Sequence, residues 1–261
     1  GTQPPFSHSR MTTLETQALT IRFGGHVAVN AVSCAFRPGE LTAIVGPNGA
    51  GKTTYFNLIS GQLRPSSGRI LFDGADITKM TAPLRTRAGL GRAFQLTNLF
   101  PNLSVEENVR LAVQAHSGTH YDMLRPWMKR RDLIERADAI LDSVALGSRR
   151  SVAATALSHG DQRKLEVALM MALEPKVYMF DEPTAGMSVD EVPVVLDLIA
   201  RLKTDPSKII LLVEHKMDVV RSLSDRIVVL HQGKLVADGK PAEVINSDIV
   251  REAYLGGAAD G

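Results

Sequence analysis

Hydrophobic and polar residues alternate along the first part of the chain, and this pattern predicts short β-strands. The runs "ALTIRF", "AVSCAF" and "LTAIVG" precede the first strong helical pattern, and "GRILFDG" adds a strand that ends in a turn at Asp73 and Gly74. From about Ser104 to Glu174 hydrophobic residues recur every three or four positions. This period predicts helices over "SVEENVRLAVQA", "RRDLIERADAILDSVAL" and "QRKLEVALMMALE". The chain therefore changes from a sheet-rich beginning to a helical middle.

Apolar strand-like runs alternate with helical patterns in the remainder of the chain. The stretches "KVYMFDEP", "KIILLVEH" and "RIVVLHQGKLVADG" predict strands, and helices are expected between them at about 189–202 and 216–223. Continuous apolar strands are typical of parallel sheets, because both faces of such sheets are covered. The alternation therefore predicts the α/β fold class, with helices on the faces of a mainly parallel sheet.

Composition adds limits rather than a function. The 261 residues include 30 basic and 28 acidic side chains, and a net charge of +2 gives little support for a nucleic-acid partner. The single cysteine, Cys34, excludes an internal disulfide framework and fits a small core residue. No apolar run approaches the ~18 residues of a membrane span. Residues 1–10 have neither an apolar core nor helical periodicity, and they read as a leader or a segment added for expression.

The stretch "GPNGAGKTT" matches the P-loop pattern G-x-x-x-x-G-K-[S/T] between a predicted strand and a predicted helix. Its glycines let backbone N–H groups face phosphates, Lys52 is expected to hold the β- and γ-phosphates, and the Thr53 hydroxyl is expected to ligate Mg²⁺. The alternative, an ordinary glycine-rich turn, does not explain the complete motif. The residues predicted to bind nucleotide are Gly46, Pro47, Asn48, Gly49, Ala50, Gly51, Lys52, Thr53 and Thr54.

The stretch "VYMFDEP" predicts a strand with acidic residues at its end, which could act together with the P-loop. Asp181 is expected to emerge at the carboxyl end of a buried strand, where α/β sheets bind ligands, and to bind Mg²⁺ directly or through water. Glu182 is expected to orient and deprotonate the attacking water. The alternative is a surface turn before Pro183, which the presence of a P-loop in the same chain disfavours.

These motifs make the chain resemble the ATP-binding subunits of ABC transporters, and in particular the ATPases of branched-chain amino acid importers. The resemblance runs from about Leu14 to Gly256 and rests on "RFGG", "GPNGAGKTT", "RAFQ", "LSHGDQ", "FDEP", "AGMS" and "VEH", in the order of the family. It implies a P-loop NTPase core with a mainly parallel central sheet, an N-terminal antiparallel β subdomain and an inserted α-helical signature subdomain. The expected unit is a single domain over residues 11–261, with the helical subdomain at about 96–174.

The resemblance also implies roles for three residues outside the P-loop. Phe23 resembles the aromatic platform that stacks on adenine, Gln95 the glutamine that reaches Mg²⁺ or the attacking water, and His215 the histidine that contacts the γ-phosphate. Each has a plainer interpretation from the residues alone: a core phenylalanine, a solvated loop residue and a structural histidine at a strand end. These roles therefore rest on the family pattern.

"LSHGDQ" resembles the family's signature loop, which serves the ATP of a second subunit rather than that of its own chain. Ser158 and the Gly160 N–H are expected to meet the partner's γ-phosphate at the start of a helix. Two residues depart from the common LSGGQ form, namely His159 and Asp161. An acidic Asp161 near ATP is expected to repel it unless the side chain turns away or pairs with a cation. The segment "AGMS" likewise departs from the usual SALD.

The expected function is an ATP-binding and ATP-hydrolysing subunit of an importer for branched-chain amino acids or related small solutes. Its cofactors are ATP and Mg²⁺. Its partners are a second ABC ATPase in a homo- or heterodimer, permease subunits docked on the region of about 96–157 and, indirectly, a solute-binding protein, but no nucleic acid. The expected location is peripheral, on the cytoplasmic membrane face. The basic run at 123–133 faces lipid or partner on this view, or is simply solvated.

Two other function classes remain open from the sequence. A soluble ABC-type ATPase of DNA repair or translation usually has a long coiled-coil insertion or two nucleotide domains, and neither pattern is present. A generic P-loop kinase leaves the signature and His215 unexplained.

Overall fold

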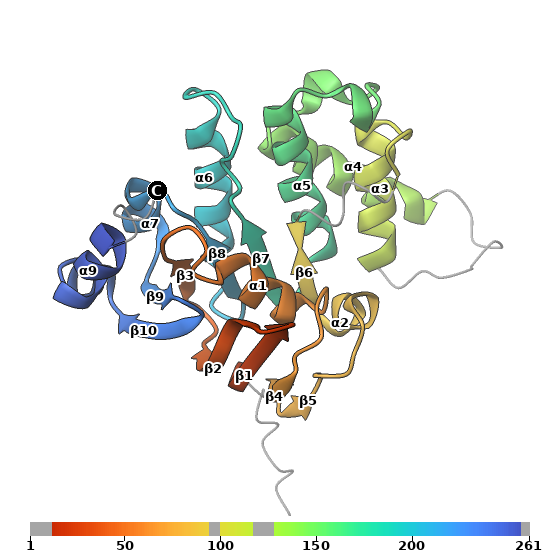
Figure 1. Cartoon of the computed structure of the whole chain (residues 1–261). Coiled ribbons are helices and arrows are strands. Elements are labelled where there is room, and N and C mark those ends of the chain that lie inside the picture. Colours follow the sequence, from red (N-terminus) through yellow and green to blue (C-terminus); the bar gives the residue numbers. More distant parts are fainter. Residues whose placement is uncertain (1–11, 94–99, 117–127, 257–261) are drawn as a thin grey trace, which may run out of the picture.

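The computed structural model describes residues 12–93, 100–116 and 128–256, and it contains two β-sheets with helices packed on them (Figure 1). The smaller sheet is antiparallel, with the strand order β2-β1-β4-β5. Its strands are β1 Leu14–Phe23, β2 His26–Phe36, β4 Ser67–Phe72 and β5 Ala75–Asp76. The predicted sheet-rich beginning is confirmed. Strands β1 and β2 both begin several residues before the predicted runs "ALTIRF" and "AVSCAF".

The larger sheet is mainly parallel, with the strand order β10-β9-β3-β8-β7-β6, and this confirms the predicted fold class. Only β10 runs antiparallel to its neighbour among the described strands of this sheet. The strands are β3 Leu41–Val45, β6 Leu90–Arg92, β7 Val177–Asp181, β8 Ile209–Val213, β9 Arg226–His231 and β10 Lys234–Gly239. Every residue of β3 and β8 is buried, because helices and the second sheet cover both faces of these strands.

The predicted helices occur in the expected order, and the structure contains several further short helices that were not predicted. The helices with predicted patterns are α1 Lys52–Ser60, α3 Val105–His116, α4 Met128–Ser143, α5 His159–Leu173, α6 Val192–Leu202 and α7 Met217–Leu223. The others are α2 Ala82–Ala88, α8 Pro241–Ile245, α9 Asp248–Gly256 and the 3₁₀ turns η2 Gly147–Arg149 and η3 Ala154–Ala156. Helices α3, α4 and α5 lie together on one side of the larger sheet (Figure 1). None of the helices among the described residues is long and apolar enough to cross a membrane.

Helix α6 begins later than predicted. Ser188 donates both its N–H (3.2 Å) and its hydroxyl (3.0 Å) to the Glu191 carboxylate, and this turn precedes the first helical residue, Val192. Pro193 then lies in the first turn, where its fixed φ suits a helix. The predicted start at about residue 189 therefore falls in the turn before the helix.

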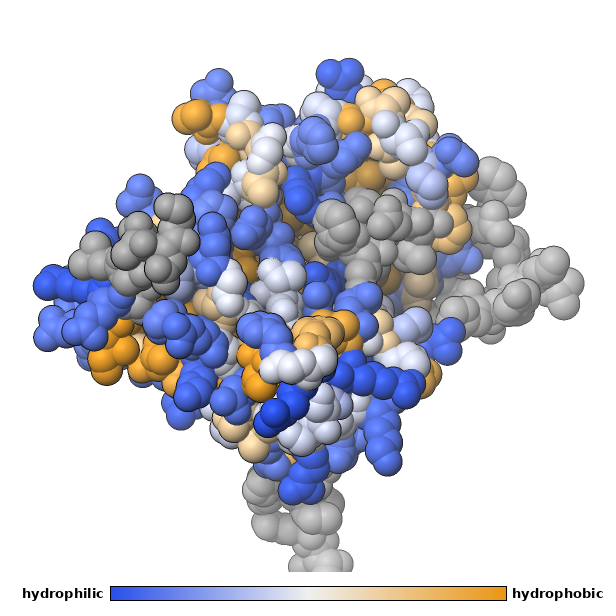
Figure 2. Space-filling view, viewed as in Figure 1, coloured by the Kyte–Doolittle hydropathy of each residue, from blue (hydrophilic) through white to orange (hydrophobic). Residues whose placement is uncertain are grey.

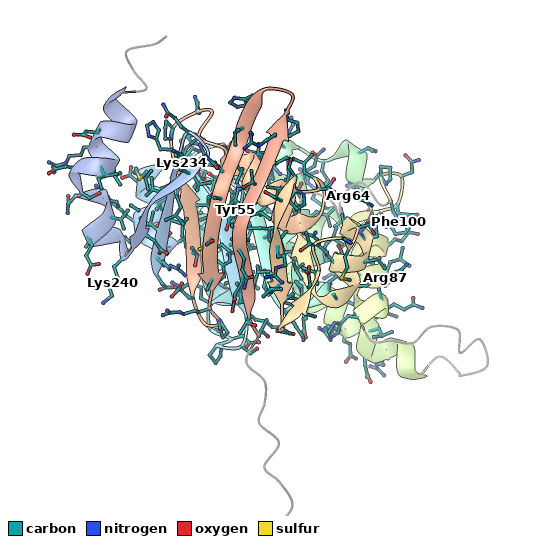
Figure 3. The ribbon with its side chains drawn as sticks, turned by 60° about the horizontal axis from the view of Figure 1, so that its bottom comes forward. Tyr55, Arg64, Arg87, Phe100, Lys234 and Lys240 are labelled. Carbon is teal, nitrogen blue, oxygen red and sulfur yellow. The ribbon has the colours of Figure 1, made fainter. Side chains whose placement is uncertain are left out.

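Helix α1 is held between the two sheets, and this position orients the loop before it. Tyr55 of α1 is fully buried and its hydroxyl lies 2.7 Å from the Thr16 hydroxyl of β1, behind the antiparallel strands in Figure 3. Cys34 of β2 is buried in the same cluster, as predicted for a core thiol, and burial raises its pKa to about 11. On the face shown in Figure 2 hydrophilic residues predominate and hydrophobic ones form small separate areas. The predicted leader, residues 1–10, lies outside the described residues.

Candidate functional site

The loop between β3 and α1 can form only with glycine at particular positions. Gly51 has φ +96° and precedes α1, and a Cβ there would lie 2.6 Å from the Ala28 carbonyl oxygen of β2. Gly46 has φ +154°, and a Cβ there would collide with the Leu230 carbonyl of β9. The close approach of β2 and β9 to this loop therefore requires glycine at Gly46 and Gly51.

Lys52 begins α1 and points its ammonium back into this loop. Its Nζ donates hydrogen bonds to the carbonyl oxygens of Gly46 (2.6 Å) and Pro47 (3.0 Å), and only 8% of the residue is exposed. Burial lowers the pKa of Lys52, and the negative charges of Glu182 and Asp181 oppose that shift. The loop, its lysine and the acidic pair after β7 therefore belong to one electrostatic site.

The start of α1 has the chemistry of an anion site. The first turn contains no acidic residue, and the N–H groups of a first turn have no partner within their own helix. Together with the positive end of the helix dipole and the Lys52 ammonium, they favour phosphate groups. Thr53 is exposed at this end, and Asn48 and Gly49 are exposed on the loop. These features are compatible with phosphate binding at the start of α1, which stays a prediction.

Asp181 ends β7 and contacts a buried guanidinium. Arg92, the last residue of β6, donates from Nη2 to Asp181 Oδ2 at 3.0 Å and from Nη1 to Asn57 Oδ1 at 2.5 Å and the Ser60 hydroxyl at 3.1 Å. Its guanidinium also lies 5.0 Å from the centre of the Phe56 ring. Burial raises the pKa of Asp181, and the charge of Arg92 opposes that shift. The sequence analysis did not single out Arg92, although Arg92 is the first residue of the quoted "RAFQ" stretch.

Glu182 and His215 lie together after the neighbouring strands β7 and β8. Glu182 Oε1 is 3.3 Å from His215 Nδ1, and both side chains face solvent, with 39% and 51% of their side chains exposed. Glu182 has φ +46°, a left-handed conformation that is uncommon for a residue with a Cβ. Its N–H donates to the Val213 carbonyl at 2.9 Å. The predicted acid–base residue and the predicted histidine therefore occupy one edge of the sheet, as their strand-end positions indicated.

Phe23 ends β1 and is half exposed, which is inconsistent with a core residue. Its hairpin partner strand β2 contributes the Ala28 carbonyl that packs on Gly51, so the exposed ring belongs to the hairpin beside the phosphate loop. Gln95, predicted to reach Mg²⁺ or water, lies outside the described residues. Residues 123–127 of the basic run at 123–133 lie outside them as well, and the rest of the run begins α4.

The signature residues begin α5. The Ser158 hydroxyl accepts a hydrogen bond from the Asp161 N–H at 3.2 Å and so caps the helix. The Asp161 carboxylate is 3.0 Å from Lys164 Nζ and 3.8 Å from Arg149 Nε, so its charge is paired with cations. Gly160 is buried, and a Cβ there would collide with the carboxylate of Glu191. These contacts lie within the helical region and the start of α6, not in the phosphate loop.

No group of three or more His, Cys, Asp or Glu side chains that could hold a metal ion occurs among the described residues. Mg²⁺ does not require such a group, because proteins commonly bind it through one or two carboxylates together with waters and substrate phosphates. Thr53, exposed in the first turn of α1, has a hydroxyl, and Asp181 has a carboxylate at the end of β7.

Comparison with known proteins agrees with this geometry. The family model described as "ABC transporter" matches residues 29–185, and that described as "Branched-chain amino acid ATP-binding cassette transporter" matches residues 234–260. The chain is 38% identical to the high-affinity branched-chain amino acid transport ATP-binding proteins BraF of Pseudomonas aeruginosa and LivG of Escherichia coli. Each of these alignments covers 94% of this chain and 98% of the relative.

A solved structure gives the same result for the fold. The ADP conformation of MJ1267, an ATP-binding cassette of an ABC transporter, superposes with a TM-score of 0.77 at 27% identity, covering 94% of this chain and 99% of that one. The phosphate loop, the acidic strand end and the signature helix thus occur in a chain with the fold of such cassettes. The chain belongs to the ABC transporter family and is one of its ATP-binding, ATP-hydrolysing cassettes.

Proposed function

We propose that this cassette powers an importer of branched-chain amino acids or related small solutes. The BraF and LivG relatives are named for branched-chain amino acid transport, and their similarity extends over nearly the whole chain. The match of residues 234–260 to a branched-chain family model supports the same substrate class. An ATPase of DNA repair or translation is not favoured, because these relatives are transport proteins. The cassette itself supplies energy and contains no path for the solute.

The proposed ATP site is built from the phosphate loop, the exposed ring of Phe23 and the ends of β7 and β8. Gly46, Gly51 and Lys52 hold the phosphates, and Phe23 stacks on the adenine, where a ring gives affinity without reading the base. Thr53 and Asp181 would hold Mg²⁺, which neutralises phosphate charge when bound. The buried Lys52 ammonium, held against the Gly46 and Pro47 carbonyl oxygens inside the loop at the start of α1, is the observation that carries this proposal.

Glu182 and His215 are proposed to carry the hydrolytic step. Glu182 orients a water molecule and accepts its proton, while the imidazole of His215 donates a hydrogen bond to the γ-phosphate. The separation of 3.3 Å between Glu182 Oε1 and His215 Nδ1 places the two groups side by side at this edge of the sheet. Gln95 is proposed to contact Mg²⁺ or the same water.

The working unit is proposed to be a dimer of cassettes bound to permease subunits. In it Ser158 and Gly160 of one chain face the ATP held by the phosphate loop of the other, so that neither chain has a complete site alone. The assembly lies peripherally on the cytoplasmic membrane face and receives its solute through a binding protein.

Reconstitution in liposomes tests the proposal. The cassette is combined with the permease subunits and the solute-binding protein encoded beside it, and ATP-dependent uptake of radiolabelled leucine and of urea is measured. Leucine uptake is expected to require ATP and to be lost with Glu182→Gln. Uptake of urea but not of leucine would contradict the substrate class, and ATP hydrolysis stimulated by DNA without permease binding would favour the rival function.

A further inference from the structure

A fully buried carboxylate, Glu214, joins the two loops that carry Glu182 and His215. It follows the last residue of β8, and its Oε2 accepts hydrogen bonds from the N–H groups of His215 (2.8 Å) and Lys216 (3.1 Å). Its Oε1 accepts the hydroxyl proton of Thr184 at 2.9 Å. Both oxygens of the buried group are therefore satisfied, and the donors come from two different loops.

Thr184 is the matching residue on the loop after β7. It lies two positions beyond Glu182 and is fully buried, and its hydroxyl oxygen also accepts from Lys216 Nζ at 3.4 Å. On either side of Glu182 the backbone is held as well, because the Glu182 N–H donates to Val213 and the Ala185 N–H donates to the Glu182 carbonyl at 3.0 Å. The Thr184–Glu214 hydrogen bond thus closes a ring of contacts beneath Glu182 and His215.

The two side chains above this ring have few constraints of their own. Glu182 and His215 are both more than one-third exposed, and the contact between them is 3.3 Å. Their relative position depends on the backbone that carries them. Misplacement of a reacting group by about 1 Å can cost about 100-fold in rate. A hydrogen bond that sets the separation of the two loops is therefore expected to act on turnover rather than on nucleotide affinity.

We infer that Glu214 and Thr184 are a pair of positioning residues that hold Glu182 and His215 in register for ATP hydrolysis. This inference rests on the proposed function, since it assumes that Glu182 and His215 act on ATP. A carboxylate suits this task because it can accept three hydrogen bonds at once from rigid donors. An apolar side chain of similar size would fill the space without linking the loops.

Thr184→Val tests the inference, because valine keeps the shape of threonine and removes only the hydroxyl. The full chain is assayed for kcat and KM of Mg-ATP hydrolysis. We expect kcat to fall by about 10–100-fold, with KM changed by less than about threefold. Thr184→Ser keeps the hydroxyl and is expected to hydrolyse ATP nearly as fast as the unmodified chain.

Thr42→Val is the matched control. Thr42 is also buried and donates its hydroxyl to a carboxylate, Glu40 Oε1, at 3.1 Å, but at the opposite end of β3 from the phosphate loop. It is expected to lose stability without losing kcat. Glu214→Met provides a second route that does not depend on Thr184→Val folding, because an apolar side chain of similar size removes the link between the loops, and it is expected to lower kcat by about tenfold or more. Because the two residues act as a unit, the double variant should be no slower than the slower single variant.

Two outcomes would overturn the inference: a Thr184→Val chain with reduced thermal stability but unchanged kcat, or a Thr184→Ser chain as slow as the valine variant. Glu182→Gln and His215→Ala are measured in the same assay to separate this inference from the proposed function. If both hydrolyse ATP at the normal rate, the proposed roles of Glu182 and His215 are wrong. If both are slow while Thr184→Val is not, the positioning role alone is wrong.

Discussion

Arg92→Met should destabilise the fold because it leaves Asp181 without its cation. The side chains of Arg92 and Asp181 are only 10% and 19% exposed, and Arg92 also donates to Asn57 and Ser60. Breaking a fully buried ion pair costs about 3–5 kcal/mol. Allowing for the residual exposure and for the methylene contacts that methionine keeps with Phe56, we expect a loss of about 2–3 kcal/mol. For a chain of this size that corresponds to roughly 5–10 °C in Tm.

The loss should depend on pH in a defined direction. Burial already raises the pKa of Asp181, and removing the opposing charge of Arg92 raises it further. A carboxyl whose folded pKa lies above its unfolded value adds most to stability when protonated, and that contribution is lost as pH rises through the folded pKa. The difference between the two proteins should therefore be largest near neutral pH and shrink as pH falls toward the ordinary aspartate pKa.

Urea unfolding in EDTA at pH 7 and at pH 5 measures this difference. Arg150→Met is the control, since Arg150 pairs with Asp138 (2.5 Å) and Asp142 (2.8 Å) at the surface, where such pairs contribute about 0–1 kcal/mol. If Arg92→Met lost no more stability than Arg150→Met, or lost the same amount at both pH values, the account of Asp181 as a charge dependent on Arg92 would be wrong.

Four further predictions concern the nucleotide site. Glu182→Gln should lower kcat by about 10²–10⁴ with little change in Tm, since its side chain is 39% exposed, and normal turnover in a steady-state assay would exclude it as the base. Lys52→Ala should weaken ATP binding itself in a titration, because it removes a charge facing the phosphates. Gly51→Ala should lower Tm more than Gly49→Ala, because both have positive φ but only Gly51 has a backbone oxygen 2.6 Å from the added Cβ; equal losses would contradict this. Ser158→Arg should bind ATP as a monomer yet hydrolyse it poorly, and mixing it with Lys52→Ala chains should restore activity, because one site of each mixed dimer is then intact; no recovery would contradict completion in trans.

Periodicity predicted the long elements because each buries one face or both faces over many residues. The strands β3, β7 and β8 are continuous apolar runs, and α5 lies where its three-to-four spacing indicated. The strand β6 has three residues, too few to show a period, and the helix α2 buries only Arg85, so its sequence has no apolar stripe; neither was predicted. Their positions are set by pairing with β7 and by the Arg85 guanidinium, which donates to carbonyls of Leu58 and Ile59 at the end of α1.

The site was predictable where chemistry depends on adjacent residues, and not where it depends on contacts across the fold. The phosphate loop is contiguous, so its glycines and Lys52 could be identified from spacing alone. Arg92 and Glu214 act through partners 89 and 30 residues away, namely Asp181 and Thr184. The one available sign of Glu214 was a charged residue directly after a wholly buried strand, where an acidic side chain needs specific donors.

The unusual residue Asp161 of the signature and the nearby Glu191 have different contacts at the start of α5. Asp161 has cations on two sides, so it does not oppose an anion at the start of α5. Glu191 is the acidic group that does lie there: its carboxylate covers Gly160 and is only 4.0 Å from Lys164 Nζ. If the γ-phosphate of ATP bound to a second chain reaches this helix as proposed, the phosphate must approach from the exposed Ser158 side or displace Glu191. A side chain at Gly160 would collide with Glu191 within its own chain. A change at Ser158 removes the hydroxyl that caps α5, at a cost of about 1 kcal/mol, and otherwise alters the exposed surface that a second chain would meet.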